Sequence, residues 1–124
     1  MDLRVKRVYD DPSATDGYRV LIDRLWPRGV SRERAKLDRW EPELAPTADL
    51  RRWFGHDPAR FAEFRRRYID ELRDRRQLLS ALRRRARDGT VTLVYSARDT
   101  EHNDAVVLAE VLRLGLPANR EAER

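Results

Sequence analysis

Apolar residues form three strand-like segments in this chain of 124 residues. Apolar and polar residues alternate imperfectly over 3–9, and an apolar run lies within 18–25. Val, Thr, Leu and Tyr fill most of 90–97. Turn-forming residues over 10–17 close the first segment, so we expect a short edge strand there. The pattern predicts about three strands.

Short helices are predicted after the second strand. Ser31 and Thr47 stand where a side chain can cap the free N–H groups of a helix, which predicts helices over 31–36 and 48–54. The segment between them, 37–46, contains two prolines and a tryptophan and is predicted to be irregular.

The longest helical pattern begins at Asp57, which precedes a proline suited to the first helical position. Its apolar residues recur every three or four positions, lapse over 74–76 and then resume up to Gly89, a predicted C-cap glycine. We therefore predict two helices or one kinked helix. A last helix, apolar on nearly every side, is predicted over 101–114.

These elements predict a small single-domain α/β fold with helices packed on the sheet. The strands over 18–25 and 90–97 should form a parallel pair, because a long helical crossover joins them. The connection over 10–17 is too short for such a crossover, so the first strand is either an antiparallel neighbour of the second or separated from it by a third. The domain is expected to span 1–117, with a polar, frayed tail over 118–124.

The composition narrows the functional classes. The 27 Lys and Arg against 22 Asp and Glu give a net charge of +5, and all but two of the basic residues are arginine, which more often reflects codon usage than function. The chain has no cysteine, which excludes disulfides and thiol chemistry. It also lacks a stretch near the ~20 apolar residues of a membrane span, so we expect a cytoplasmic protein with no membrane partner.

Polar side chains follow both apolar strands. Carboxyl ends of parallel strands meet at one edge of a sheet, where ligands bind in open α/β folds. The residues expected to meet there are Asp23, Arg24, Trp26 and Arg28 from one strand and Tyr95, Ser96, Arg98, Asp99, His102 and Asn103 from the other.

Arg24, Arg28 and Arg98 could complete a phosphate or carboxylate pocket with the N–H groups of a helix start. Alternatively, they pair with neighbouring carboxylates and only fix the loops. The chain has no glycine-rich fingerprint of a nucleotide-binding loop.

Histidine is the natural proton carrier near pH 7, and the chain has only His56 and His102. His102 is either an acid, base or substrate contact, or a capping group. A metal site from these histidines and one of Asp57, Asp99 or Glu101 is chemically possible, but the chain has no compact metal-ligand spacing, so no metal is predicted. No cofactor is predicted either. Ser96 lacks the flanking glycines of a nucleophile elbow and is expected to be a hydrogen-bonding residue.

The tryptophans Trp26, Trp40 and Trp53 could stack on a planar ligand, although aromatic packing over loop ends is commoner. Arginines over 65–67 and 83–87 could follow a nucleic-acid backbone. Acidic residues are interleaved with them, which favours a solvated helix face.

Several segments together resemble the YeaO-like proteins, a bacterial family of the domain of unknown function numbered 488. They are 6–10, 16–29, 50–58, and 91–99 followed by 101–103. The resemblance implies a small cytoplasmic α/β domain with no established reaction. It carries over a polar set of Arg24, Trp26, Arg28, Trp53, His56, Tyr95, His102 and Asn103. Broader relatives look to have cysteines at the positions of Tyr95 and Asn103, so a thiol mechanism is not implied here.

The leading hypothesis is a site for a small anionic, nucleotide-like or otherwise planar ligand, with hydrolytic or transfer chemistry left open. Its predicted catalytic residues are His102 and Tyr95, and its predicted ligand-binding residues are Arg24, Trp26, Arg28, Trp53, His56, Ser96, Arg98 and Asn103. The alternative is a non-catalytic nucleic-acid-binding or regulatory module that uses the arginine-rich helices. The sequence gives no oligomeric state.

Overall fold

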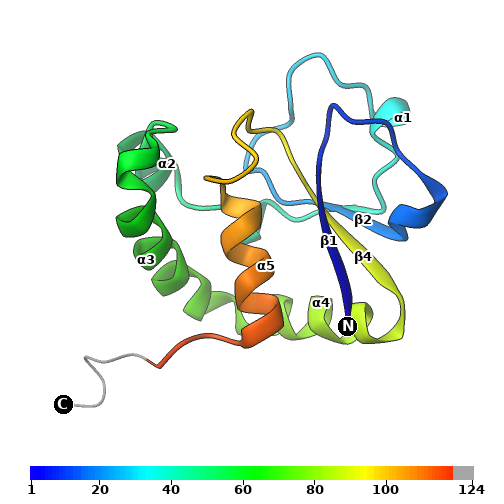
Figure 1. Ribbon diagram of the computed structural model, residues 1–124. Coiled ribbons are helices and arrows are strands. Elements are labelled where there is room, and N and C mark those ends of the chain that lie inside the picture. Colours follow the sequence, from blue (N-terminus) through cyan, green and yellow to red (C-terminus); the bar gives the residue numbers. More distant parts are fainter. Residues whose placement is uncertain (119–124) are drawn as a thin grey trace.

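The computed structural model describes residues 1–118 as one four-stranded parallel sheet with helices packed on it (Figure 1). The strands are β1 Asp2–Arg7, β2 Tyr18–Leu21, β3 Arg39–Trp40 and β4 Thr90–Tyr95. The helices are α1 Arg32–Ala35, α2 Ala48–Phe54, α3 Phe61–Leu72, α4 Arg76–Asp88 and α5 Asp104–Leu114. Apart from residue 118, the tail predicted over 118–124 lies outside the described residues.

The strand order is β1-β4-β2-β3, so β4 and β2 are the two inner strands. The predicted parallel pairing of β2 with β4 is confirmed. Of the two arrangements left open for the first strand, the second is correct, because β4 separates β1 from β2 and pairs with both in parallel. The edge position predicted for β1 is also confirmed.

The sheet has one strand more than the three predicted. β3 consists of two residues within the segment predicted to be irregular, and it pairs with the last two residues of β2. Two residues are too few for a period to appear in the sequence. β3 therefore forms because it pairs with the edge of β2 that β4 leaves open, and not because of a hydrophobic pattern of its own.

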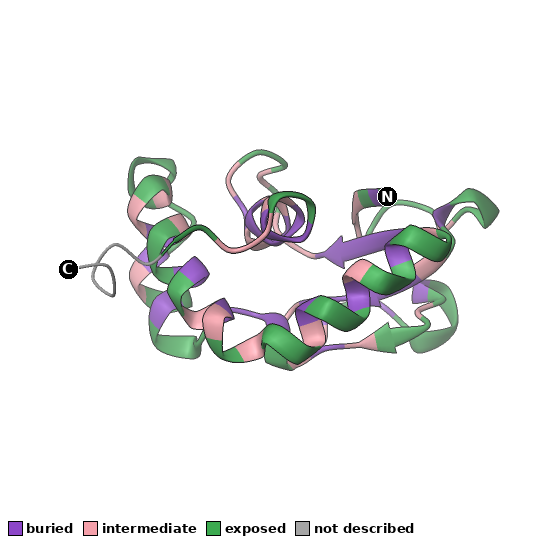
Figure 2. Ribbon diagram, turned by 90° about the horizontal axis from the view of Figure 1, so that it is seen from below, coloured by how far each residue is buried: buried purple, intermediate pink, exposed green. Residues whose placement is uncertain are grey.

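The two faces of the sheet bury separate apolar clusters. Leu93 and Tyr95 of β4 face the larger cluster with α3, α4 and α5, whereas Val94 faces a smaller cluster with Ala35 of α1. This alternation is the period of two expected for a strand. Figure 2 shows buried positions concentrated on the strands and on the helix sides that face them.

The predicted helix caps are present. The Ser31 hydroxyl accepts from the Arg34 N–H at 3.0 Å, and the Thr47 hydroxyl accepts from the Leu50 N–H at 3.2 Å. α3 and α4 are two helices joined by a 3₁₀ turn over Arg73–Arg75, one of the two predicted outcomes. Gly89 does end α4, but its backbone is extended, not left-handed.

Helix α5 begins three residues later than predicted. Asn103 is its N-cap, and the side-chain oxygen of Asn103 accepts from the Val106 N–H at 2.9 Å. Asp99 organises the preceding turn by accepting from the N–H groups of Glu101 and His102 at 2.9 and 3.0 Å. Figure 1 shows α5 between α3 and the strands, which agrees with its nearly all-apolar surface.

The turn before β2 lies directly against the start of β4. Gly17 has a φ of +62°, and a Cβ atom added there would stand 2.3 Å from the carbonyl oxygen of Thr90. Beside it, the buried carboxylate of Asp16 accepts from the Arg19 guanidinium at 2.7 Å. This contact fixes the path of the chain into β2.

Candidate functional site

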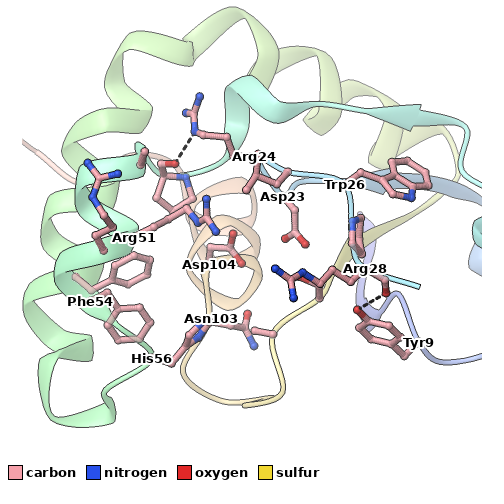
Figure 3. Close-up of a pocket in the computed structure, with 18 residues that line it drawn as sticks. Tyr9, Asp23, Arg24, Trp26, Arg28, Arg51, Phe54, His56, Asn103 and Asp104 are labelled. Carbon is pink, nitrogen blue, oxygen red and sulfur yellow. Dashed lines mark hydrogen bonds between the residues drawn. The ribbon is translucent and has the colours of Figure 1, made fainter. Parts of the chain in front are cut away.

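A pocket with a volume of about 590 Å³ lies at the carboxyl ends of β2 and β4 (Figure 3). Its walls are the segment 23–28 after β2, residues 96–97 after β4, the N-terminus of α5 and parts of α2. The volume falls in the range of small-molecule sites. The predicted meeting of the two strand ends at one edge is therefore confirmed.

Six of the predicted site residues line this pocket. They are Arg24, Trp26, Arg28, His56, Ser96 and Asn103. Four predicted residues are not part of its wall: Trp53, Tyr95, Arg98 and His102.

Arg28 and Arg24 have different surroundings. The Arg28 guanidinium points into the pocket in Figure 3, and within residues 1–118 its side chain makes no hydrogen bond or ion pair. The backbone carbonyl of Arg28 accepts from the Tyr9 hydroxyl at 3.0 Å. This bond fixes the backbone at Arg28 and leaves the guanidinium unpaired among the described residues. The Arg24 guanidinium, in contrast, donates to the carbonyls of Pro46 and Ala45 at 3.0 and 3.3 Å. Arg24 therefore stabilises the wall, whereas the Arg28 guanidinium is available to a ligand.

Trp26 and His56 contribute aromatic wall. The Trp26 N–H donates to the Val30 carbonyl at 2.7 Å, and its ring meets Trp40 edge-on at 5.6 Å between centroids. His56 follows the Gly55 that ends α2, and it has a φ of +55°, which is uncommon for a residue other than glycine. The buried ring of Phe54 lies 6.2 Å from the His56 ring.

Asn103 lines the pocket, but its amide is already engaged. Its NH₂ group donates to the Asp99 carbonyl at 2.8 Å while its oxygen caps α5. Asn103 therefore shapes the wall and has little capacity left for a ligand.

The two predicted catalytic residues lie outside the pocket wall. Tyr95 is buried in the larger cluster, and burial raises the pKa of its hydroxyl. The His102 Nδ1 atom lies 2.9 Å from the Asp99 carboxylate, and its ring meets Phe61 edge-on at 5.2 Å. These contacts make His102 part of the turn before α5.

Trp53 and Arg98 also point elsewhere. The guanidinium groups of Arg67 and Arg60 lie over the Trp53 ring at 4.3 and 5.4 Å from its centroid. Arg98 is exposed on the turn after β4.

Two aspartates that the predicted residue set omitted occupy the pocket. Asp23 follows β2 by two residues, and Asp104 is the first residue of α5. Figure 3 shows both carboxyl groups pointing into the same part of the pocket. The Oδ2 atom of Asp23 is buried and, among the described residues, has no hydrogen-bond partner.

Burial raises the pKa of both aspartates. For Asp23, hydrogen bonding from Ser96 and the positive charge of Arg51 oppose the rise in pKa. For Asp104, burial and the neighbouring Asp23 carboxyl raise the pKa to about 7, against the same Arg51 charge. Two acidic groups that disfavour each other's ionisation are unusual outside functional sites.

The sequence contains a partial signal for this pair. Asp23 directly follows the apolar run of β2, so its place at the strand end was predicted, although it was not among the predicted catalytic or ligand-binding residues. Asp104 resembles the acidic residue that commonly opens a helix, because the negative charge suits the helix dipole. Arg51 lies on the polar side of α2, where a solvated residue is the ordinary expectation.

Residues 1–118 contain neither a cluster of metal-ligating side chains nor a membrane-spanning helix. This part of the chain contains no group of three or more acidic or histidine side chains arranged to hold a metal ion. None of its helices combines the length and apolarity needed to cross a membrane.

The chain folds as a mixed α/β domain with a pocket at the carboxyl edge of its parallel sheet. The chain belongs to the YeaO-like DUF488 family, since residues 2–124 match the family described as "Inactive DUF488-N3 subclade". It is 42% identical to "Uncharacterized protein YeaO" of Escherichia coli (strain K12) over 113 residues, which cover 91% of this chain and 98% of that protein.

Mycobacterial proteins are similar to it as well. "Uncharacterized protein Rv3073c" of Mycobacterium tuberculosis (strain ATCC 25618 / H37Rv) is 41% identical over 110 residues, 89% of this chain and 92% of that protein. The same values hold for "Uncharacterized protein Mb3100c" of Mycobacterium bovis (strain ATCC BAA-935 / AF2122/97). No solved structure gives a significant match.

Proposed function

We propose that this protein binds a small anionic, planar ligand of the nucleotide type in the strand-edge pocket, without transforming it. The observation that carries the proposal is the inward-pointing guanidinium of Arg28, which has no partner among the described residues and stands in a cavity of about 590 Å³. A ligand phosphate or carboxylate would supply that partner through charge-assisted hydrogen bonds.

The charges of the wall support an anionic ligand. Four arginines line the pocket against two aspartates, so the wall stays net positive even when both carboxyls are ionised. Arg24 is tied to backbone carbonyls and Arg52 pairs with Asp49, which leaves Arg28 and Arg51 nearest to an entering anion. The position outside the carboxyl ends of parallel strands supports the same conclusion.

The aromatic residues of the wall support a planar ligand. Trp26, Phe54 and His56 present ring edges or faces to the same cavity. Aromatic side chains and convergent polar groups are the usual lining of small-molecule sites.

Binding without turnover is favoured by the position of the two predicted catalytic residues. The side chains of His102 and Tyr95 lie outside the wall, so neither reaches a ligand there to move a proton. The family description "Inactive" points in the same direction. Hydrolytic or transfer chemistry is therefore the less supported part of the initial hypothesis.

The test compares nucleoside 5′-monophosphates with the matching nucleosides by titration calorimetry on the full chain. The monophosphates should bind and the nucleosides should bind at least tenfold more weakly, because only the former reach Arg28. Arg28→Ala should weaken monophosphate binding by roughly 10-fold or more. Arg84→Ala, an exposed arginine of α4 away from the pocket, is the matched control and should bind as the wild type does.

Absence of binding across nucleoside monophosphates and small sugar phosphates would reject the proposal. So would equal binding by Arg28→Ala and the wild type. Formation of any product from a bound monophosphate would reject the non-catalytic part alone.

A nucleic-acid-binding module is the second candidate, and exposed α4 arginines favour it. Arg76 and Arg84 flank a shallow depression, and neither has an ion pair among the described residues. The arginines of α3 are less available, since Arg65 pairs with Glu110 and Arg67 stacks on Trp53. Short duplex DNA or single-stranded RNA should then bind with steep salt dependence and lose affinity in Arg84→Ala but not in Arg28→Ala.

A further inference from the structure

The pair of half-buried carboxyls, Asp23 and Asp104, is the part of the pocket that an anion alone leaves unexplained. The Asp23 Oδ2 atom is buried, points into the cavity and has no hydrogen-bond partner among the described residues. Leaving a buried acceptor unpaired is costly, and native structures do so mainly where a water, ion or ligand completes the site.

Asp104 adds a second acceptor group beside the first. Its carboxyl converges on the same part of the cavity as that of Asp23, from the opposite element, α5. One Asp104 oxygen accepts from the Ala105 N–H at 2.9 Å, which fixes the direction of the group. Ser96, at the end of β4, lines the same pocket beside these carboxyls. The acceptors are thus held in place before any ligand arrives.

An ionised carboxylate can only accept hydrogen bonds, so the ligand must supply N–H or O–H donors. Two carboxyls side by side suit a planar edge that carries adjacent donors. Guanine offers such an edge in its N1–H and exocyclic amine. Adenine and cytosine place a single amine next to an acceptor nitrogen, and that acceptor would face a carboxylate.

We propose that Asp23 and Asp104 select guanine, so that the ligand of this pocket is a guanine nucleotide with its phosphate at Arg28. This inference rests on the proposed function and adds the identity of the base. The ligand's donors would pair with the carboxyls and its anion with the Arg28 guanidinium. The Asp23 Oδ2 atom and the Arg28 side chain, which have no partner among the described residues, would then both gain one. Phe54 and Trp26 supply apolar wall for the ring system between them.

The test compares guanosine, inosine and adenosine 5′-monophosphates by calorimetry on the full wild-type chain at about pH 8, above the Asp104 pKa of about 7. Inosine monophosphate lacks only the exocyclic amine of guanosine monophosphate, so the pair isolates one donor. We expect guanosine monophosphate to bind at least tenfold more tightly than inosine monophosphate and more tightly still than adenosine monophosphate.

The variant Asp23→Asn keeps the shape of the side chain but replaces one acceptor oxygen by a donor. It should reduce the preference for guanosine over inosine monophosphate to below about threefold. Asp88→Asn removes the same charge at the exposed end of α4 and should keep the full preference. A thermal melt of each variant identifies loss of fold as a separate cause.

Equal affinities for the three monophosphates in the wild type would overturn the inference, while an effect of Arg28→Ala on all three would leave the proposed function standing. A preference for guanosine monophosphate that survives Asp23→Asn would also overturn the assignment to this carboxyl. If none of the three binds, the guanine assignment fails, and binding of another small anion through Arg28 decides the proposed function.

Discussion

Asp104 serves two purposes that conflict. As the first residue of α5, its negative charge suits the helix N-terminus, yet its carboxyl is half-buried next to Asp23. The folded protein therefore holds a proton on Asp104 up to about pH 7, whereas the unfolded chain releases it near the ordinary value of 3.8. The free energy of unfolding should fall as the pH rises through this interval, because the folded state binds more protons there.

The variant Asp104→Asn should remove this pH-dependent loss. Asparagine cannot ionise, so the variant should gain roughly 1–3 kcal/mol over the wild type at about pH 8 and much less at about pH 4.5. Urea unfolding at the two pH values measures the difference. An equal gain at both would show that Asp104 does not titrate between them.

Single residues mark where prediction from sequence stopped. Tyr95 was predicted at the strand end, and it is there, but the alternation along β4 turns its ring toward the helices. His102 was predicted at a helix start, yet the cap at Asn103 moves that start and leaves His102 in the turn with Asp99. A shift of a few residues in an element boundary changes which side chains reach the pocket. Sequence patterns do not fix boundaries that finely.

At the scale of elements, the entry into β2 depends on one glycine. Gly17 combines a left-handed φ of +62° with a carbonyl oxygen of Thr90 that would lie 2.3 Å from an added Cβ. Gly29 has a similar φ of +72°, but nothing lies within 4 Å of its Cβ position. Substituting Gly29 therefore tests the positive φ alone, whereas substituting Gly17 tests the positive φ together with a steric clash.

Gly17→Ala should destabilise the fold by about 3 kcal/mol or more, since the contact is with backbone that cannot move aside. Gly29→Ala should cost about 1 kcal/mol from the φ angle alone. Chemical denaturation of both variants gives the comparison. Similar losses in the two would mean that the chain beside Thr90 relaxes easily.

Helices were easier to predict than the short strand. Ser31 and Thr47 each cap the helix expected of them, because a capping side chain is a local feature. β3 was missed, because its two residues pair only with β2 and carry no period of their own. Local chemistry thus predicted most of the helices, and partners distant in the sequence determined the fourth strand.

The whole molecule is organised around β4. Both β1 and β2 pair with it and not with each other, and its residues Leu93 and Val94 enter the two separate apolar clusters. The parallel relation of β2 and β4 followed from the crossover rule, which depends only on the order of strands and helices. The choice between two positions for β1 could not be made from a connection length.

A chain ending at residue 89 should therefore fail to fold, although it keeps three of the four strands and all of α1–α4. Without β4, the pairing of β1 and the inner side of β2 are lost together. The shortened chain retains Trp26, Trp40 and Trp53, so near-ultraviolet circular dichroism can compare its aromatic packing with that of the full chain. A cooperative unfolding transition in the shortened chain would contradict this prediction.

The position of β4 between β1 and β2 also orders events during synthesis. β1 leaves the ribosome first, yet its hydrogen-bonding partner is translated 88 positions later, as the pairing of Asp2 with Thr90 requires. At a translation rate of ~5–20 residues per second, the backbone N–H and C=O groups of β1 therefore wait several seconds for their partner strand. Chaperones that shield such strands should therefore raise the yield of native protein. Rare codons that delay translation before Thr90 should change this yield more than rare codons placed after α5.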